Sequence, residues 1–301
     1  MGYHQVFTLD LKFLGKSQAI AAYLIPHKGG AVLIECGPGS TRANLVSRLA
    51  EYGYKPEDIT DVFLTHIHLD HSGAAGWLAS RGAKIHVHPL GAPHIQNPEK
   101  LLASAARIYG DKMDELWGEF IPVTPQNIST PEDGQILNIN GLRIKALNTP
   151  GHANHHFSYL VEEVCFTGDV GGVRMPGTRL LRLPMPPPEL NLEIWRASLH
   201  RLQQEKIMYI APTHFGIFAD PEWQFEQIAS YLDEVEAWIE KHLNDDKTFE
   251  QVKQEYMGWS YQHTLAQGLS QADVETFELV NPTEMSDFGI YRYWQKFRQG
   301  T

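Results

Sequence analysis

The feature that most constrains this chain is a dense group of potential metal ligands between residues 65 and 73. Three histidines and one aspartate lie within six positions: His66, His68, Asp70 and His71. Residues 59–64 before them are apolar and rich in β-branched side chains, which predicts a strand. The small residues from Gly73 onward favour a helix. The group therefore lies where a strand hands over to a helix, at the edge of a sheet where α/β proteins build their sites.

The spacing of the four residues predicts how they are arranged. If residues 65–70 stay extended, alternation places His66, His68 and Asp70 on one side, while His71 enters the helix and points elsewhere. One short segment could then serve two metals. Imidazole and carboxylate together suit zinc and similar divalent metals. A purely structural role is a poorer interpretation, because such a cluster would be costly to bury without a partner.

Three later segments extend this pattern into a family signature. Residues 149–152, 166–169 and 212–216 read Thr-Pro-Gly-His, Phe-Thr-Gly-Asp and Pro-Thr-His-Phe-Gly, and each follows an apolar run. With the His-x-His-x-Asp-His motif they resemble the metallo-β-lactamase superfamily, over about the first 220 residues and in the family's order. The resemblance points to the glyoxalase II and lactonase-like branch, and it implies an α/β fold, a four-layer αββα sandwich.

The resemblance also implies a set of metal ligands. One metal is expected on three histidines, a second on one aspartate and two histidines, and Asp169 is expected to bridge them. The first set is His66, His68 and His152, and the second is Asp70, His71 and His214. A hydroxide held between two cations is a nucleophile at neutral pH. Asp70 is expected to be catalytic as well, orienting this hydroxide and shuttling its proton.

Three further residues are candidates for supporting these ligands. The family usually has an aspartate at the position of Glu35, where it orients a ligand histidine. Glu35 is one methylene longer, so it either takes this role from a shifted backbone or merely ends its strand. His155 and His156 follow His152 closely, and each is either a supporting or pocket-lining residue or an ordinary structural one.

The chain is expected to form one catalytic domain with two helical additions. Residues 1–244 are the predicted metallo-β-lactamase-like domain, and residues 90–122 form a helical insertion within it. This insertion is either a wall over the pocket or an amphipathic helix on the surface. Residues 245–301 are a predicted helical extension, which could cover the active site or form a homodimer interface.

One long loop remains between the last two motifs. Residues 171–188 are rich in glycine and proline, and loops of this length in a compact domain are usually functional. The arginines of this loop could bind an anionic substrate or be solvated, and they are Arg174, Arg179 and Arg182.

The charge and composition of the chain limit the classes of binding partner that we expect. The 301 residues carry a formal net charge of −11, which disfavours nucleic acid and anionic membranes. Cys36 and Cys165 form no CxxC motif and are predicted to be buried free thiols, consistent with a reducing compartment. Neither a signal-like N-terminus nor an apolar run of membrane length is visible. We expect a cytoplasmic protein with a small-molecule substrate.

The predicted function is that of a metal-dependent hydrolase. A metal-bridging hydroxide would attack a small ester, lactone or thioester, with two divalent ions as cofactors: zinc, or else manganese or iron. Two alternatives remain at this level, a single-iron persulfide dioxygenase-like oxidoreductase and a non-enzymatic metal-binding protein. The complete second ligand set favours two metals and therefore hydrolysis.

Overall fold

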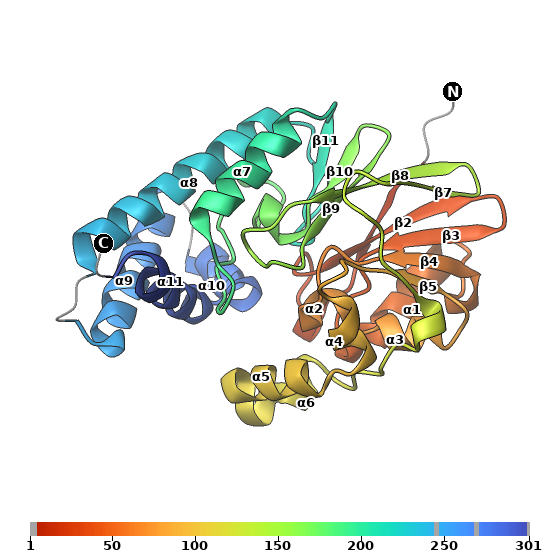
Figure 1. Cartoon of the computed structure of the whole chain (residues 1–301), viewed down its shortest axis with the longest axis horizontal. Coiled ribbons are helices and arrows are strands. Elements are labelled where there is room, and N and C mark those ends of the chain that lie inside the picture. The colour runs from red at the N-terminus through yellow and green to blue at the C-terminus, as the bar shows by residue number, and fades with distance from the viewer. Residues whose placement is uncertain (1–4, 244–246, 268–270, 300–301) are drawn as a thin grey trace.

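Two β-sheets pack face to face between two layers of helices (Figure 1). The computed structural model describes residues 5–243, 247–267 and 271–299. Within them the chain is an α/β protein with the expected four-layer αββα sandwich, followed by further helices toward the C-terminus. The predicted domain boundary at residues 244 and 245 lies outside the described residues.

The first sheet contains the strands of the N-terminal part in sequence order. They are β1 (Phe7–Asp10), β2 (Ala21–His27), β3 (Gly30–Ile34), β4 (Ile59–Phe63), β5 (Lys84–His86) and β6 (Ile128–Ser129). The pairs from β1 to β3 are antiparallel, and those from β3 to β6 are parallel. The parallel strands therefore deliver the chain repeatedly to one edge of the sheet.

The second sheet runs in the order β11, β10, β9, β8, β7. Its strands are β7 (Ile136–Ile139), β8 (Leu142–Asn148), β9 (Phe157–Val161), β10 (Val164–Phe166) and β11 (Tyr209–Ala211). β7 and β8 form a hairpin around Asn140-Gly141, both of which have positive φ, as tight hairpin turns require. β10 and β11 are parallel neighbours, so the segments after them emerge close together.

The strands near the centre of the sandwich are apolar on both faces because both faces are buried. In β2, Tyr23 and Ile25 face the second sheet, whereas Ala22 and Leu24 face the helices outside the first sheet. This alternation places every residue of an apolar run against another layer, as in sheets covered on both sides. The continuous apolar runs of the sequence are thus explained by the sandwich.

The helices divide between the two outer faces and the C-terminal end. α1 (Arg42–Glu51), α2 (Leu69–Ser72), α3 (Ala75–Ala79) and α4 (Ala92–Gln96) lie on the first sheet's side, followed by α5 (Glu99–Tyr109) and α6 (Met113–Leu116). α7 (Leu192–Gln203) and α8 (Pro221–His242) cover the second sheet, and α9 (Phe249–Ala266), α10 (Gln271–Val280) and α11 (Thr283–Phe297) follow. α9 and α11 contribute Tyr256 and Trp294 to the core shared with α7 and α8.

The arginines of the 171–188 loop mainly serve the fold. Arg174 is buried, and both of its terminal nitrogens donate hydrogen bonds to the Asp220 carboxylate, at 2.7 and 2.9 Å. Arg182 is buried and donates to Glu278 at 2.7 Å. The expectation that these two bind substrate or solvent is therefore wrong, whereas Arg179 is exposed, with its guanidinium 3.5 Å from Asp220.

Two simpler expectations concern the cysteines and membrane spans. Cys36 and Cys165 are buried and free, as predicted. Among the helices that the structure describes, none combines the length and apolar character needed to cross a membrane.

Candidate metal centre

The central motif occupies a loop and one short helix rather than an extended segment. β4 ends at Phe63, and α2 begins at Leu69, directly after His68. The expectation that residues 65–70 stay extended is therefore wrong from Leu69 onward. The His71 amide donates to the His68 carbonyl at 3.0 Å, so the chain has already turned at Asp70. As a result Asp70 leaves the side of His66 and His68 and faces the same centre as His71.

The first group of converging side chains contains three histidines. His66 Nε2 lies 2.9 Å from His68 Nδ1, and His152 Nε2 lies 3.0 Å from the same atom. His152 comes from the loop after β8, more than eighty residues further along the chain. With Asp169, the three rings place one ligand atom each within 4.8 Å of one another.

The second group lies beside the first and contains one aspartate and two histidines. Asp70 Oδ2 is 3.4 Å from His71 Nε2 and 3.4 Å from His214 Nε2. His214 comes from the segment after β11. The three ligand atoms again lie within 4.8 Å of one another, so every predicted metal-ligand position reaches one of two adjacent centres.

Asp169 joins the two groups with its two carboxylate oxygens. Oδ2 lies 3.3 Å from His152 Nε2, and Oδ1 lies 3.3 Å from His71 Nε2. The preceding Gly168 has φ +51°, and a Cβ there would lie 2.4 Å from Thr65 Oγ1. A side chain at this position would therefore push the Asp169 turn away from the site, which explains glycine before the aspartate.

The hydrogen bonds of His152 and His214 that point away from the metal centre show which ring nitrogen carries the proton. The other nitrogen then offers its lone pair to the centre. His152 Nδ1 lies 2.8 Å from the Pro184 carbonyl, and His214 Nδ1 lies 2.8 Å from the Ala19 carbonyl. A carbonyl only accepts, so Nδ1 carries the proton in both rings, and Nε2 of the neutral ring offers a lone pair.

The buried atoms at the centre fit a cation. His71 Nε2 and Asp169 Oδ1 are buried and make no hydrogen bond with any described residue. Several imidazole nitrogens and two carboxylates point at the same small volume. A buried cluster of this kind is costly unless cations join its members, whether these are protons on the imidazoles or metal ions. The residues present therefore fit divalent metals, with nitrogen and oxygen ligands typical of zinc.

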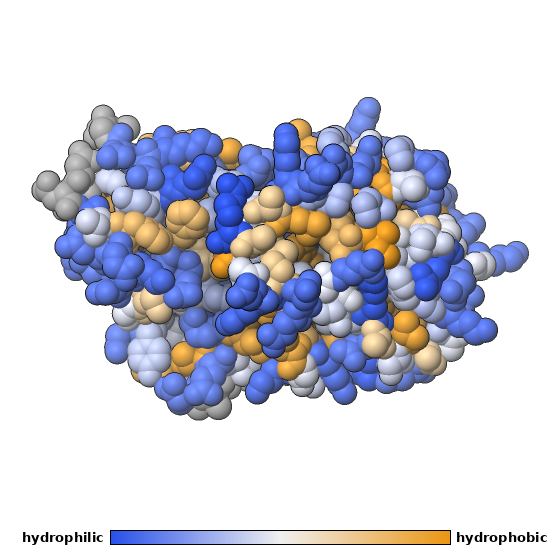
Figure 2. All heavy atoms as spheres, turned by 90° about the horizontal axis from the view of Figure 1, so that it is seen from below, coloured by the Kyte–Doolittle hydropathy of each residue, from blue (hydrophilic) through white to orange (hydrophobic). Residues whose placement is uncertain are grey.

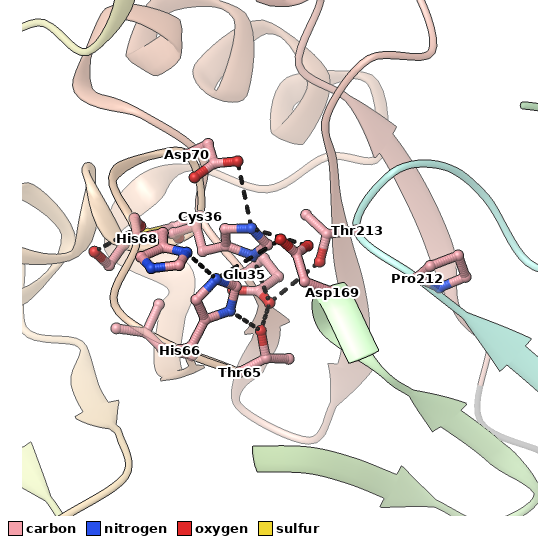
Figure 3. Close-up of polar contacts among 12 residues, drawn as sticks. Glu35, Cys36, Thr65, His66, His68, Asp70, Asp169, Pro212 and Thr213 are labelled. Atoms are coloured by element: carbon pink, nitrogen blue, oxygen red, sulfur yellow. Dashed lines mark hydrogen bonds and ion pairs between the residues drawn. The ribbon is translucent and has the colours of Figure 1, made fainter. Parts of the chain in front are cut away.

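Glu35 connects one histidine of each group (Figure 3). Its Oε1 accepts from His71 Nδ1 at 3.1 Å and from the Thr65 hydroxyl. Because Thr65 donates to Glu35, its oxygen can accept from His66 Nδ1, 3.1 Å away. Glu35 has φ +64°, a left-handed backbone conformation that is uncommon for a residue other than glycine. One carboxylate thus orients His71 directly and His66 through a threonine.

We expect Glu35→Ala to weaken both metals. His71 and His66 would lose the partners that fix their rings, and such partners are typically worth about 10- to 100-fold in metal affinity. Titration of metal-free protein against a chromophoric chelator measures the affinities. Glu35→Gln keeps one accepting oxygen and should lose less. Unchanged affinity of both metals in Glu35→Ala would contradict the role of Glu35.

The two groups differ in their proton affinity. Burial lowers the pKa of His66 and His68 well below the ordinary histidine value. Burial also acts on His71, but the nearby carboxylates of Asp70, Asp169 and Glu35 outweigh it and hold its pKa well above that value. The first group is therefore neutral at neutral pH, whereas metal binding at the second group must displace a proton.

His155 and His156 lie next to the ligands in different ways. His156 is buried, its Nδ1 is 3.0 Å from Thr149 Oγ1, and its ring stacks on His66 with centroids 5.1 Å apart. His155 is half-buried, and its Nε2 lies 3.6 Å from the Glu189 carboxylate. His156 thus supports a ligand ring, and His155 lines the opening above it.

A cavity of about 350 Å³ opens over the two groups. Its floor carries five of the predicted ligands, and its walls include residues of α5, the prolines at 184–188 and residues 279–285. The sequence predicted the α5 wall as one of two interpretations. It did not reveal the carbonyls of Ala19 and Pro184, because backbone acceptors leave no trace in a residue pattern. It also missed the roles of Thr65 and Glu189, whose partners Glu35 and Asn154 lie far from them in the sequence.

Comparisons with known proteins agree with this architecture. The family model of the metallo-beta-lactamase superfamily matches residues 18–214. The chain is 26% identical over 215 residues to the metallo-beta-lactamase fold-containing protein ST1585 of Sulfurisphaera tokodaii, covering 69% of this chain and 80% of that protein. It is 30% identical over 214 residues to an atrochrysone carboxyl ACP thioesterase of Aspergillus fumigatus, covering 70% of this chain but only 55% of that protein.

Solved structures extend the likeness over nearly the whole chain. The metallo-beta-lactamase family protein TTHA1429 from Thermus thermophilus has a TM-score of 0.72 at 21% identity, covering 97% of this chain and 93% of that chain. The Rm3 metallo-beta-lactamase has a TM-score of 0.59 at 16% identity and covers 80% of this chain and 93% of its own. At these identities the likeness shows the fold.

Proposed function

Because the chain belongs to the metallo-β-lactamase superfamily, we propose that it is a metal-dependent hydrolase of a small ester, lactone or thioester, working with two divalent ions. The observation that carries this proposal is the placement of Asp169, whose two oxygens face two separate groups of ligand atoms. A single metal would serve only one of these groups. The thioesterase among the relatives supports an acyl substrate, although this chain spans only about half of that protein.

The residues of the site would have three roles: metal binding, proton transfer and orientation of the ligand rings. His66, His68 and His152 would hold one cation, Asp70, His71 and His214 the other, and Asp169 both. Two bound cations would supply hydroxide at neutral pH and polarise the acyl oxygen. Asp70 has a partly exposed carboxylate that also lines the cavity, so it can orient water and accept a proton beside the substrate. Glu35 and the carbonyls of Ala19 and Pro184 hold the rings in place.

Elemental analysis and a substrate panel test the proposal together. Protein purified without added metal is analysed for its metal content and assayed with esters, lactones and thioesters, while an oxygen electrode records uptake with glutathione persulfide. We expect two zinc or manganese ions per chain and acyl hydrolysis without oxygen consumption. At most one metal after reconstitution, with oxygen uptake by the iron form and no hydrolysis, would make the oxidoreductase the better assignment.

A further inference from the structure

The walls of the cavity are apolar although its floor is highly polar. Along α5, Leu101, Ala105 and Ile108 line the cavity, and their spacing places them on one face of the helix. Ile108 remains 42% exposed, so this face is only partly covered by the rest of the chain. Figure 2 views the molecule from the side of α5 and α6, where hydrophobic side chains gather in the middle of a largely hydrophilic face.

Aromatic rings close one side of the same cavity. Trp117 stacks on Phe13 with centroids 5.7 Å apart, and Tyr109 meets Trp117 edge to face at 5.0 Å. All three line the cavity. Their mutual packing fixes a flat apolar surface beside the metal ligands, so this side is preformed and does not depend on a bound molecule.

The opposite wall comes from the C-terminal part of the chain. Leu279 and Met285 line the cavity there. This segment is anchored by buried Arg182, which donates to Glu278 at 2.7 Å and to Thr283 at 2.6 Å. A wall held by a buried arginine at residues 278 and 283 is fixed in position, and its distance from α5 sets the width of the cavity.

The chemistry of the walls favours an apolar ligand. Among the described lining residues away from the metal ligands, the formally charged side chains are Lys100, which is exposed, and Glu189, which already accepts from the Asn154 amide at 2.8 Å. The walls also carry the uncharged polar side chains of His94, Ser104, Tyr109 and Asn281. Apolar side chains outnumber them, so a sugar or a nucleotide would find few partners here. An alkyl chain needs no such partners.

The volume limits the length of such a chain. A cavity of about 350 Å³ lies at the small end of the roughly 300–1,000 Å³ typical of small-ligand sites, so it suits a chain of medium length. Between these apolar walls, the part of the substrate that enters the cavity is the acyl chain.

We propose that the substrate carries an unbranched acyl chain of roughly eight to twelve carbons, held between α5 and residues 279–285 with its carbonyl over Asp70 and Asp169. This inference rests on the proposed hydrolase function and names the substrate class of the same site. Each added methylene should raise kcat/KM by about threefold to fourfold, until the cavity is full.

The test uses a series of thioesters, from acetyl to hexadecanoyl, on one small thiol. We expect kcat/KM to rise with chain length up to about ten carbons and then to level off or fall. Ala105→Phe fills the cavity from α5 and should lower the ratio of decanoyl to acetyl kcat/KM by at least about tenfold. Ala106→Phe makes the same change on the exposed face of α5 and should leave this ratio unchanged.

A cavity-enlarging variant guards against a folding defect. Leu101→Ala should move the preferred length toward longer chains by one or two carbons, which a damaged protein would not do. Kinetics that do not depend on chain length, or an equal loss of the ratio in Ala105→Phe and Ala106→Phe, would overturn the acyl-chain proposal while leaving the hydrolase function intact.

Binding of a ligand that cannot be hydrolysed distinguishes the acyl-chain proposal from the hydrolase proposal. Calorimetry with decan-1-ol, which has no acyl bond, should detect binding that weakens at least about tenfold in Ala105→Phe and persists in Ala106→Phe. Such binding by a protein that hydrolyses no thioester of the series and no ester or lactone of the panel would support the apolar cavity and overturn the hydrolase function. Hydrolysis without any binding of decanol would overturn the cavity proposal alone.

Discussion

Asp169→Ala is expected to remove most of the bound metal from both centres and to abolish activity. One carboxylate faces both ligand groups, with Oδ2 3.3 Å from His152 Nε2 and Oδ1 3.3 Å from His71 Nε2. The loss of activity should exceed about 100-fold, because even partners one step removed from a metal are typically worth 10- to 100-fold. Elemental analysis after gel filtration, with kcat/KM on an accepted acyl substrate, measures both effects.

His214→Ala provides the contrast for this variant. His214 approaches Asp70 and Asp169 Oδ1 but is not part of the three-histidine group. The substitution His214→Ala should therefore empty mainly the second centre, leaving about one metal per chain. Circular dichroism should show that both variants keep their fold. Full occupancy of both centres in Asp169→Ala, or equal losses in the two variants, would contradict the shared carboxylate.

Asp70→Asn is expected to lower kcat by about 100- to 10,000-fold, the range typical of a group that transfers protons in the reaction. Asparagine keeps the size of the side chain but removes its charge and its ability to accept a proton. Its effect should fall on kcat and on the second metal, with the first centre occupied as before. Steady-state kinetics and metal analysis at saturating zinc separate the two contributions.

Asp111→Asn is the matched control for this substitution. Asp111 is exposed just after α5 and does not line the cavity, so the same loss of charge there should leave kcat and metal content unchanged. A wild-type kcat in Asp70→Asn with both metals bound would show that Asp70 is neither an essential ligand nor the proton acceptor.

Much of this protein can be predicted from local patterns. The apolar run at residues 59–64 predicted the buried strand β4, because a strand between two covered faces has few positions for a polar side chain. The density of His66, His68, Asp70 and His71 predicted a metal site. Each of these features depends on residues close together in the sequence, where the types and spacing of side chains nearly determine the outcome.

The sequence was a poorer guide to side chains whose partners are distant. Arg174 and Arg182 carry the same charge whether they meet a substrate, water or a buried carboxylate, and only packing against Asp220 and Glu278 decides between these. The turn at Asp70 was missed because alternation assumes an extended backbone. Two hydrogen bonds to the His68 carbonyl, from the His71 and Ser72 amides, end that alternation.

The sequence by itself determined which ligand types this protein has and that nitrogen and oxygen donors would meet a divalent metal, since donor chemistry belongs to the residues. Only the tertiary structure decided that Asp169 divides its two oxygens between the groups. It likewise decided that carbonyls of Ala19 and Pro184 orient the rings. The cavity walls at Leu101 and Met285 meet across 184 residues. These features arise from contacts between distant segments, which no local pattern encodes.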